Sequence, residues 1–508
     1  MIISISLALM IAGTLLVILN RTDIPEIPIY LGSGLLLTAL VSIAQSRDII
    51  SHEFIEAEIM REIALLGLSI LVFYSTSGRI LDPKSSTAIK SFKASMWLSL
   101  VSFAGITGLS LYFGFNSLES LFFGVTASLG STLLDSGLVK EEARKNHIYG
   151  WITEDIDFFD DLFGIVVLTL ILAYVGGIAP FTGLMVSLGL ILSTVVLREH
   201  FSSLIMRVTG GENELVLLSG IATLISLVWV TESTGVSALA GIYAAGLLLI
   251  DTELGFRVRE RFTAVKDFFT ALSFISIGYL LTLPGLRYLA VATGLVIFAS
   301  FIRPLLSTQV LRLQGYDLRT SFMASVQSSQ ISEIVVVGSL LIAPLTQSPV
   351  FETVAIGFAA TTLIAHLIED REQYIFDKLF SEYELDSEKS FVPNDIEDHV
   401  ILAGYDWKTK GLENIVDKDV IVADYSLERV QDAEERGLPH LLADLHSDEA
   451  WEKLEVEKAS VIVSAVDDND LIDKIEGLDV DAEKILLSSG SEEFEDELRE
   501  MLAEALKN

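Results

Sequence analysis

Long apolar runs separated by short polar connections occupy most of the chain. Thirteen of these runs are long enough for a helix that crosses a hydrocarbon core of about 30 Å, which takes roughly 20 residues. They lie near residues 2–20, 27–46, 59–78, 94–114, 117–136, 152–175, 178–197, 214–231, 235–251, 264–283, 286–311, 320–343 and 350–369. The pattern predicts an all-α polytopic membrane protein with about 13 transmembrane helices in the lipid bilayer.

Basic residues alternate between the connections. One set of connections is rich in Lys and Arg and the other is base-poor, with Arg287 as the exception. The positive-inside rule then predicts a plasma-membrane protein with its N-terminus outside and its C-terminus in the cytoplasm. The first run has no basic segment before it and no small-residue cleavage site, so we expect a retained span instead of a signal peptide.

The chain beyond the last run reads as a small parallel α/β domain. Strands are expected at His399–Tyr405, Asp419–Asp424 and Ala459–Ala465, with helical segments between them. The expected organisation is a transmembrane domain at 1–375, a linker at 376–397 and a cytoplasmic α/β domain at 398–508.

The C-terminal part is also strongly acidic. From residue 381 onward it holds 37 Asp and Glu against 12 Lys and Arg, within a chain of formal net charge -35. Such a charge excludes nucleic acid as a partner and favours a protein adapted to a salt-rich, halophilic cytoplasm, with a calcium- or partner-binding surface as the alternative. The chain has no Cys, which excludes disulfides, thiolate metal sites and thiol nucleophiles.

Two adjacent acids, Asp160 and Asp161, lie inside the run near 152–175. A helix that enters the membrane near residue 151 and rises about 1.5 Å per residue places them roughly 14 Å deep. A carboxylate at that depth is costly, so we expect a function for both instead of dipole stabilisation at a helix start. Glu154 and Asp157 share a helix face with Asp161 and are interpreted either as an acidic access path for cations or as N-terminal helix acids.

Two other runs are interrupted by small and hydroxylated residues, at Ala127–Thr132 and Gln327–Glu333. Such segments can unwind and coordinate a cation, and their similar places in the two halves indicate inverted repeats; a close helix-packing seam is the alternative. Arg303 lies too deep in its run to reach water, so it needs a counter-ion. Asp160 or Asp161 is the natural partner, and Glu333 is the other possibility.

Together these segments resemble the monovalent cation:proton antiporter superfamily, in the branch of NapA-type sodium/proton and Kef-type potassium efflux systems. The resemblance covers residues from about 55 to 370 and rests on several motifs in the family's order. These are Gly130-Ser-Thr-Leu, Phe159-Asp-Asp-Leu-Phe-Gly, Thr234-Gly-Val-Ser-Ala-Leu-Ala-Gly, Phe274-Ile-Ser-Ile-Gly and Gln330-Ile-Ser-Glu.

The resemblance implies an NhaA-like homodimer with two crossed, unwound helices and no cofactor. It implies that Asp161 binds the ion and the proton with Asp160 as its partner, that Thr132 and Ser131 are ligands at the crossover, and that Arg303 and Glu333 supply counter-charges. The C-terminal part resembles a TrkA-N nucleotide-binding domain. Its phosphate loop, Gly404-Tyr-Asp-Trp-Lys-Thr-Lys-Gly, departs from G-x-G-x-x-G and makes nucleotide binding doubtful, although Asp424 stands in the place of the ribose-binding acid.

The leading functional hypothesis is therefore exchange of cytoplasmic Na⁺ (or Li⁺) for external H⁺, which would serve pH homeostasis. Both ions would compete for Asp161, because the cation needs the carboxylate and a proton discharges it. Potassium/proton exchange is the alternative, and an intramembrane aspartyl protease or a ligand-gated channel is remote. The two aspartates favour electrogenic exchange slightly, unless Arg303 stays paired with Asp160, in which case exchange would be one for one.

Overall fold

The structure is a computed structural model of the whole chain. It describes residues 10–47 (less 12 and 15–24), 56–77, 86–131, 148–379 (less 178, 235–236, 317, 347 and 370) and 391–486 (less 394–395, 406–408, 410–411, 413–417, 425–426, 444, 446–447 and 465–468). The first apolar run and Thr132 thus lie mostly or wholly outside the described residues.

Helices occupy each of the apolar runs from residue 27 onward. Those of the first half are α2 (Glu26–Ser46), α3 (Ala57–Ser77), α4 (Ser86–Tyr112), α5 (Ser117–Ser128), α7 (Ile148–Val175), α8 (Pro180–Thr209) and α9 (Asn213–Ser233). Those of the second half are α10 (Ala238–Leu249), α11 (Glu253–Leu280), α12 (Leu286–Ile297), α13 (Arg303–Leu313), α14 (Leu318–Gln327), α15 (Glu333–Ile342) and α16 (Val350–Glu369). A π-helical turn, η1 (Phe298–Ile302), joins α12 to α13, and the short α17 (Glu372–Leu379) follows α16.

Eight helices of the described chain are long and apolar enough to cross a membrane, or nine if the pair α10 and α11, bent by 115°, counts as one span. Helices α14 and α15 fall below that length because the backbone between them unwinds, and α5 is followed by an unwound segment at Gly130–Ser131, where this part of the described chain ends. The prediction of a polytopic helical membrane domain is confirmed, whereas the count of thirteen spans stays a prediction.

Local signals fix where the interrupted helices begin. The side chain of Asn116 accepts a hydrogen bond from the amide of Glu119 (2.9 Å), and the Glu119 carboxylate accepts one from the amide of Asn116 (3.0 Å). This reciprocal capping box satisfies two amides that have no partner within the helix. Ser332 caps α15 in the same position by accepting from the amide of Ile334 (3.3 Å).

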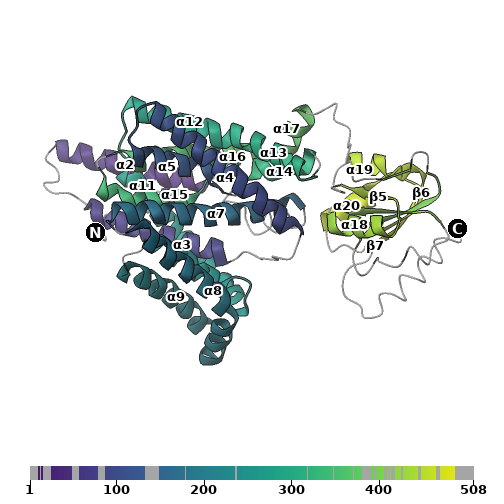
Figure 1. Cartoon of the computed structure of the whole chain (residues 1–508), viewed down its shortest axis with the longest axis horizontal. Coiled ribbons are helices and arrows are strands. Elements are labelled where there is room, and N and C mark those ends of the chain that lie inside the picture. Colours follow the sequence, from purple (N-terminus) through teal and green to yellow (C-terminus); the bar gives the residue numbers. More distant parts are fainter. Residues whose placement is uncertain are drawn as a thin grey trace.

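The membrane helices pack in two groups. In one, α11 packs on α2 and α3, and α10 packs on α3, α8 and α9. In the other, α4 packs on α5 and α7, and α12 and α15 pack on α16. Helix α7 contacts α8 and α10 and so joins the groups (Figure 1). The outer surface carries exposed apolar side chains such as Phe181, Val196 and Leu286, as expected where lipid replaces water.

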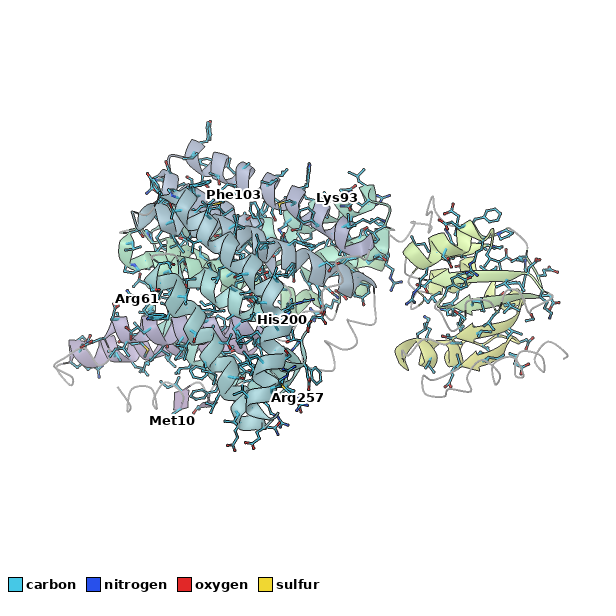
Figure 2. The ribbon with its side chains drawn as sticks, turned by 60° about the horizontal axis from the view of Figure 1, so that its bottom comes forward. Met10, Arg61, Lys93, Phe103, His200 and Arg257 are labelled. Atoms are coloured by element: carbon cyan, nitrogen blue, oxygen red, sulfur yellow. The ribbon has the colours of Figure 1, made fainter. Side chains whose placement is uncertain are left out.

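The C-terminal domain lies at one end of the helical bundle, next to α17 (Figure 1). Figure 2 shows Lys93 on α4 nearer to this domain than Phe103. The basic connection at the start of α4 is thus at the same end as the domain, which agrees with the charge alternation of the sequence.

The domain itself is a five-stranded parallel sheet in the order β5-β4-β3-β6-β7. The three predicted strands are present as β3 (His399–Ala403), β4 (Val420–Asp424) and β6 (Ala459–Ser464). Two short strands were not predicted, β5 (His440–Leu442) and β7 (Glu483–Leu486), because three or four residues carry little periodicity. Helices α18 (Leu427–Glu435), α19 (Asp448–Lys453) and α20 (Asn469–Gly477) connect the strands. The strand order is that of a dinucleotide-binding fold.

Candidate ion-binding site

The two interrupted helices cross at their unwound segments. Helix α5 ends at Ser128 and continues as β1 (Gly130–Ser131), and α14 ends at Gln327 and continues as β2 (Gln330–Ile331). The two segments pair antiparallel, with Gly130 opposite Ile331 and Ser131 opposite Gln330. Backbone groups released by unwinding need partners inside a membrane, and each segment provides them for the other. The predicted pair of unwound, crossing helices is therefore present.

Helix α16 provides hydrogen-bond partners for the second unwound segment, β2. The hydroxyl of Thr361 accepts a hydrogen bond from the amide of Ile331 (3.2 Å), and the side-chain amide of Gln330 donates to the hydroxyl of Thr362 (2.8 Å). All four residues are buried. The two threonines were not predicted, although adjacent hydroxyls within an apolar helix are a detectable signal for a polar neighbour.

Helix α7 places three buried acids beside the crossing. The exposed fractions of Asp157, Asp160 and Asp161 are 2%, 0% and 5%. Asp157 accepts a hydrogen bond from the hydroxyl of Ser328 (2.8 Å), and Asp161 accepts one from the hydroxyl of Ser332 (3.4 Å). Ser328 precedes β2 and Ser332 comes after it, so α7 runs alongside the unwound part of the second interrupted helix.

Asp160 has the densest set of partners. Its Oδ1 atom accepts hydrogen bonds from the hydroxyls of Ser95 and Ser99, both at 2.7 Å, and its Oδ2 atom accepts one from the amide of Gly130 (3.3 Å). The two serines lie four residues apart on α4 and therefore share one face of that helix. They were not predicted, because α4 holds several other hydroxyl residues, such as Ser91 and Ser102, and the sequence does not distinguish the two that face Asp160.

Arg303 is the ion-pair partner of Asp160. Its Nη2 atom bonds to Oδ2 of Asp160, and its Nη1 atom donates to the carbonyl of Ser328 (2.8 Å). The guanidinium is 2% exposed and also lies near the carbonyl of Ser128 (3.4 Å), so it links both interrupted helices. Of the counter-ions considered from the sequence, the structure selects Asp160, and Glu333 instead accepts from the hydroxyl of Ser131 (3.0 Å).

The π-helical turn η1 lies immediately before Arg303 and the structure places it beside the crossing. A π-turn widens a helix by one residue and is often found at functional sites. Here Arg303 follows the π-turn, and Pro304, which has no amide hydrogen to donate, follows Arg303. The irregular turn and the proline therefore flank the residue that carries the guanidinium.

The cluster gathers four buried carboxylates. Asp157, Asp160, Asp161 and Glu333 are all at least 95% buried, and Arg303 forms an ion pair with Asp160. Removing several like charges from water is too costly unless protons or cations neutralise them. Glu154, the other residue of the predicted access path, is half-buried on α7, two turns before Asp161 and one turn before Asp157.

Gly130 is required for the contact between β1 and Arg303. A Cβ atom at this position would collide with Nη1 of Arg303 and lie 2.5 Å from the hydroxyl and 2.7 Å from the carbonyl oxygen of Ser328. We expect Gly130→Ala to lose about 1–3 kcal/mol of stability through this overpacking and to impair exchange. Thermal unfolding of the purified protein measures the first effect. Gly108→Ala, where the added atom meets nothing within 4 Å, is the control, and equal melting temperatures for the two variants would contradict the expectation.

Asp424 in the C-terminal domain is already bonded within the domain. It is fully buried at the end of β4, and its Oδ2 atom accepts hydrogen bonds from the amide of Tyr405 (2.6 Å) and from Nη1 of Arg429 (3.3 Å). The carboxylate thus holds the loop after β3 in place. The substituted part of the phosphate loop, Asp406 and Trp407, lies outside the described residues.

Buried carboxylates beside two crossing, unwound membrane segments are an arrangement typical of ion-coupled membrane transporters. The particular family follows from comparison with known proteins. Residues 5–368 match the transmembrane domain of the sodium/hydrogen exchangers, and residues 401–503 match the TrkA-N domain. The chain belongs to the sodium/hydrogen exchanger family and carries a C-terminal TrkA-N domain.

Relatives of the chain include both potassium and sodium transporters by name. K(+) efflux antiporter 5 of Arabidopsis thaliana is 26% identical over 247 residues, which are 46% of this chain and 43% of that protein, so the match spans less than half of that relative. YbaL of Escherichia coli (strain K12), named as a cation/proton antiporter, is 24% identical over 446 residues, 81% of this chain and 78% of YbaL. The solved structure of the sodium proton antiporter MjNhaP1 from Methanocaldococcus jannaschii has a TM-score of 0.56 at 18% identity, covering 74% of this chain and 98% of that chain. This last likeness concerns the fold alone.

Proposed function

We propose that the protein exchanges cytoplasmic Na⁺ or Li⁺ for external H⁺, with both ions competing for Asp161. The observation that supports the proposal is that the two adjacent aspartates have different partners. Asp160 pairs with Arg303 and accepts three further hydrogen bonds, whereas Asp161 contacts the hydroxyl of Ser332 at the start of α15. Because Arg303 and three other donors already occupy both oxygens of Asp160, Asp161 is the better candidate to bind a cation.

Competition at one carboxylate couples the two fluxes. A sodium ion needs the ionised carboxylate and further oxygen ligands, which the hydroxyls and the unwound backbone near Asp161 would supply. Ser131 and Thr132 on the first unwound segment remain candidate ligands, and Asp157 and Glu154 remain the proposed access path. A proton removes the charge and with it the cation. A carrier that changes access only when Asp161 is neutralised by one ion or the other exchanges them.

The two helix groups support an alternating-access cycle. The site lies in the group of α4, α5, α7 and α12–α16, and the group of α2, α3 and α8–α11 would form the static, dimer-forming part of a homodimer. The proposed organisation is a transport domain at 1–375, a linker at 376–397 and a regulatory domain at 398–508. In the proposed orientation the N-terminus is outside and the C-terminal domain is cytoplasmic.

Potassium is the competing substrate, because the names of several relatives specify K⁺ efflux. A fluorescence-dequenching assay with the full-length protein in proteoliposomes distinguishes the two cations. We expect Na⁺ and Li⁺ to collapse a preformed proton gradient and K⁺ to have little effect at the same concentration. A response to K⁺ alone would replace sodium by potassium in the proposal, and no response to any of the three would overturn it.

We also propose that the TrkA-N domain of this chain does not bind NAD tightly. The acid that would contact a ribose, Asp424, is buried and bonded to Tyr405 and Arg429. In the sequence, Asp406 and Trp407 replace the glycine that lets a pyrophosphate approach the backbone, and Asp406 adds a negative charge. The transport chemistry proposed above needs no cofactor.

A further inference from the structure

A cavity of about 450 Å³ opens between α4 and the α12–η1 segment, away from the aspartates. Its walls are almost entirely apolar and include Ile106 and Leu109 of α4, Val291 and Gly294 of α12, and Phe298 of η1. Among the described residues that line it, Arg287 alone carries a charge. The size and the mostly apolar lining with one fixed polar group are those of a site for a small apolar or amphipathic molecule.

The position of the cavity indicates that its occupant comes from the bilayer. Both walls belong to helices that are apolar and long enough to span it, at Ala88–Tyr112 and Leu286–Leu313. Apolar side chains here are unusually exposed: Phe113, which lines the cavity, is 63% exposed, and Leu286, which directly precedes the lining residue Arg287 in the chain, is 86% exposed. In a membrane protein such side chains contact lipid, so lipid acyl chains are the molecules available to enter the cavity.

Arg287 lies at the mouth of this cavity. Two contacts hold its guanidinium in place, and neither neutralises its charge. Its Nη2 atom donates to the carbonyl of Phe113 (2.8 Å), and its guanidinium lies 3.9 Å from the centre of the Phe115 ring. Both phenylalanines line the cavity, and neither a carbonyl nor a ring neutralises the guanidinium. A planar guanidinium fixed in this way is suited to a phosphate.

Glu119 is the acid in the same cluster, and its carboxylate is occupied elsewhere. Its Oε1 atom accepts from the hydroxyls of Tyr288 (2.6 Å) and Ser348 (2.5 Å), and its Oε2 atom accepts from the amide of Asn116 (3.0 Å). The side chain is 6% exposed. The buried Glu119 carboxylate therefore attracts Arg287, and the guanidinium stays exposed and can still bind a ligand.

We propose that an anionic phospholipid binds here, with its phosphate on Arg287 and one acyl chain between α4 and α12. The lipid would belong to the leaflet remote from the C-terminal domain, since α12 runs from Leu286 through η1 to α13 and α14, which contacts α17 (Figure 1). This site also accounts for Arg287 as the exceptional base on an otherwise base-poor side of the membrane.

The bound chain would touch the turn that places Arg303. Phe298 and Ile302, the first and last residues of η1, both line the cavity, and Arg303 follows directly. Packing against a π-turn restricts the alternative helical arrangements of that turn. Lipid in the cavity would therefore hold Arg303 on Asp160, and this second part of the inference rests on the proposed function.

Lipid binding is tested without any transport assay. The full-length protein is equilibrated in micelles with equal amounts of phosphatidylglycerol and phosphatidylcholine, and bound lipid is counted by native mass spectrometry. We expect about five-fold more phosphatidylglycerol than phosphatidylcholine on the native protein, from one basic contact to an anionic headgroup. Arg287→Gln should equalise the two lipids. Gly294→Phe, which places a ring in open space within the cavity, should remove both.

Gly105→Phe is the matched control, because this α4 glycine also faces open space but does not line the cavity. It should retain lipid like the native protein. Equal retention of lipid by Gly294→Phe and Gly105→Phe would overturn the site, and an unchanged lipid preference in Arg287→Gln would overturn the role of the guanidinium. For the link to Arg303, exchange is compared in liposomes with and without phosphatidylglycerol. If the native protein and Gly294→Phe respond equally to the lipid, that link is refuted while the binding result stands.

Discussion

Asp161→Asn is expected to reduce cation/proton exchange to the level of empty liposomes while the protein stays inserted and folded. The amide has the size of the protonated acid, so the packing around Ser332 is kept, but it can neither bind a cation by charge nor release a proton. Because Arg303 pairs with Asp160, neutralising Asp161 leaves that ion pair in place. The loss should therefore concern function and not stability.

The measurement is sodium-induced dequenching in proteoliposomes, combined with the elution volume and melting temperature of the purified variant. Asp155→Asn, on the same helix but half-buried outside the cluster of buried acids, is the control and should exchange like the native protein. A correctly inserted Asp161→Asn protein with native exchange would remove Asp161 from the proposed mechanism.

Arg303→Gln is expected to change the stoichiometry of exchange. If the ion pair between Arg303 and Asp160 persists through the cycle, only Asp161 is available to the exchanged ions, and we expect the native protein to move one Na⁺ for one H⁺. Removing the guanidinium would leave an unpaired buried carboxylate, which costs about 3–5 kcal/mol if it stays charged. Protonation of Asp160 relieves that cost. A second proton can then enter the cycle, and exchange becomes electrogenic.

The test follows sodium-driven proton movement with and without valinomycin, at equal K⁺ on both sides to clamp the voltage. Native rates should be indifferent to the clamp, and Arg303→Gln rates should change with it. The double variant Asp160→Asn with Arg303→Gln lacks both charges and should again be indifferent. Voltage-dependent exchange by the native protein would show that the pair opens during the cycle, as the two aspartates alone had favoured.

Both oxygens of Asp160 are occupied by donors. Ser95 and Ser99 donate to one oxygen, and the amide of Gly130 and the guanidinium of Arg303 bind the other. Gly130→Ala and Arg303→Gln therefore both test the contacts around Asp160. The first does so through stability and the second through stoichiometry.

The sequence by itself determined the local features of this protein. Apolar length and polar connections predicted the helices, small hydroxylated residues predicted the breaks near Gly130 and Gln330, and three runs of β-branched residues predicted β3, β4 and β6. The depth of Asp160 and Asp161 within an apolar run was the signal that predicted a function for them. Each of these conclusions depends on residues within about one turn or one strand of each other, where spacing and side-chain type decide the structure.

Only the tertiary structure decided which partners each aspartate has. Adjacent residues on a helix point about 100° apart, so Asp160 and Asp161 meet different neighbours, and the neighbours come from distant parts of the chain. Asp160 meets Ser95, Ser99 and Arg303, which are 65, 61 and 143 residues away, and Asp161 meets Ser332, 171 residues away. Periodicity carries no information on such pairs. They are set by which helix faces pack together and by the need of a buried guanidinium to find a buried carboxylate.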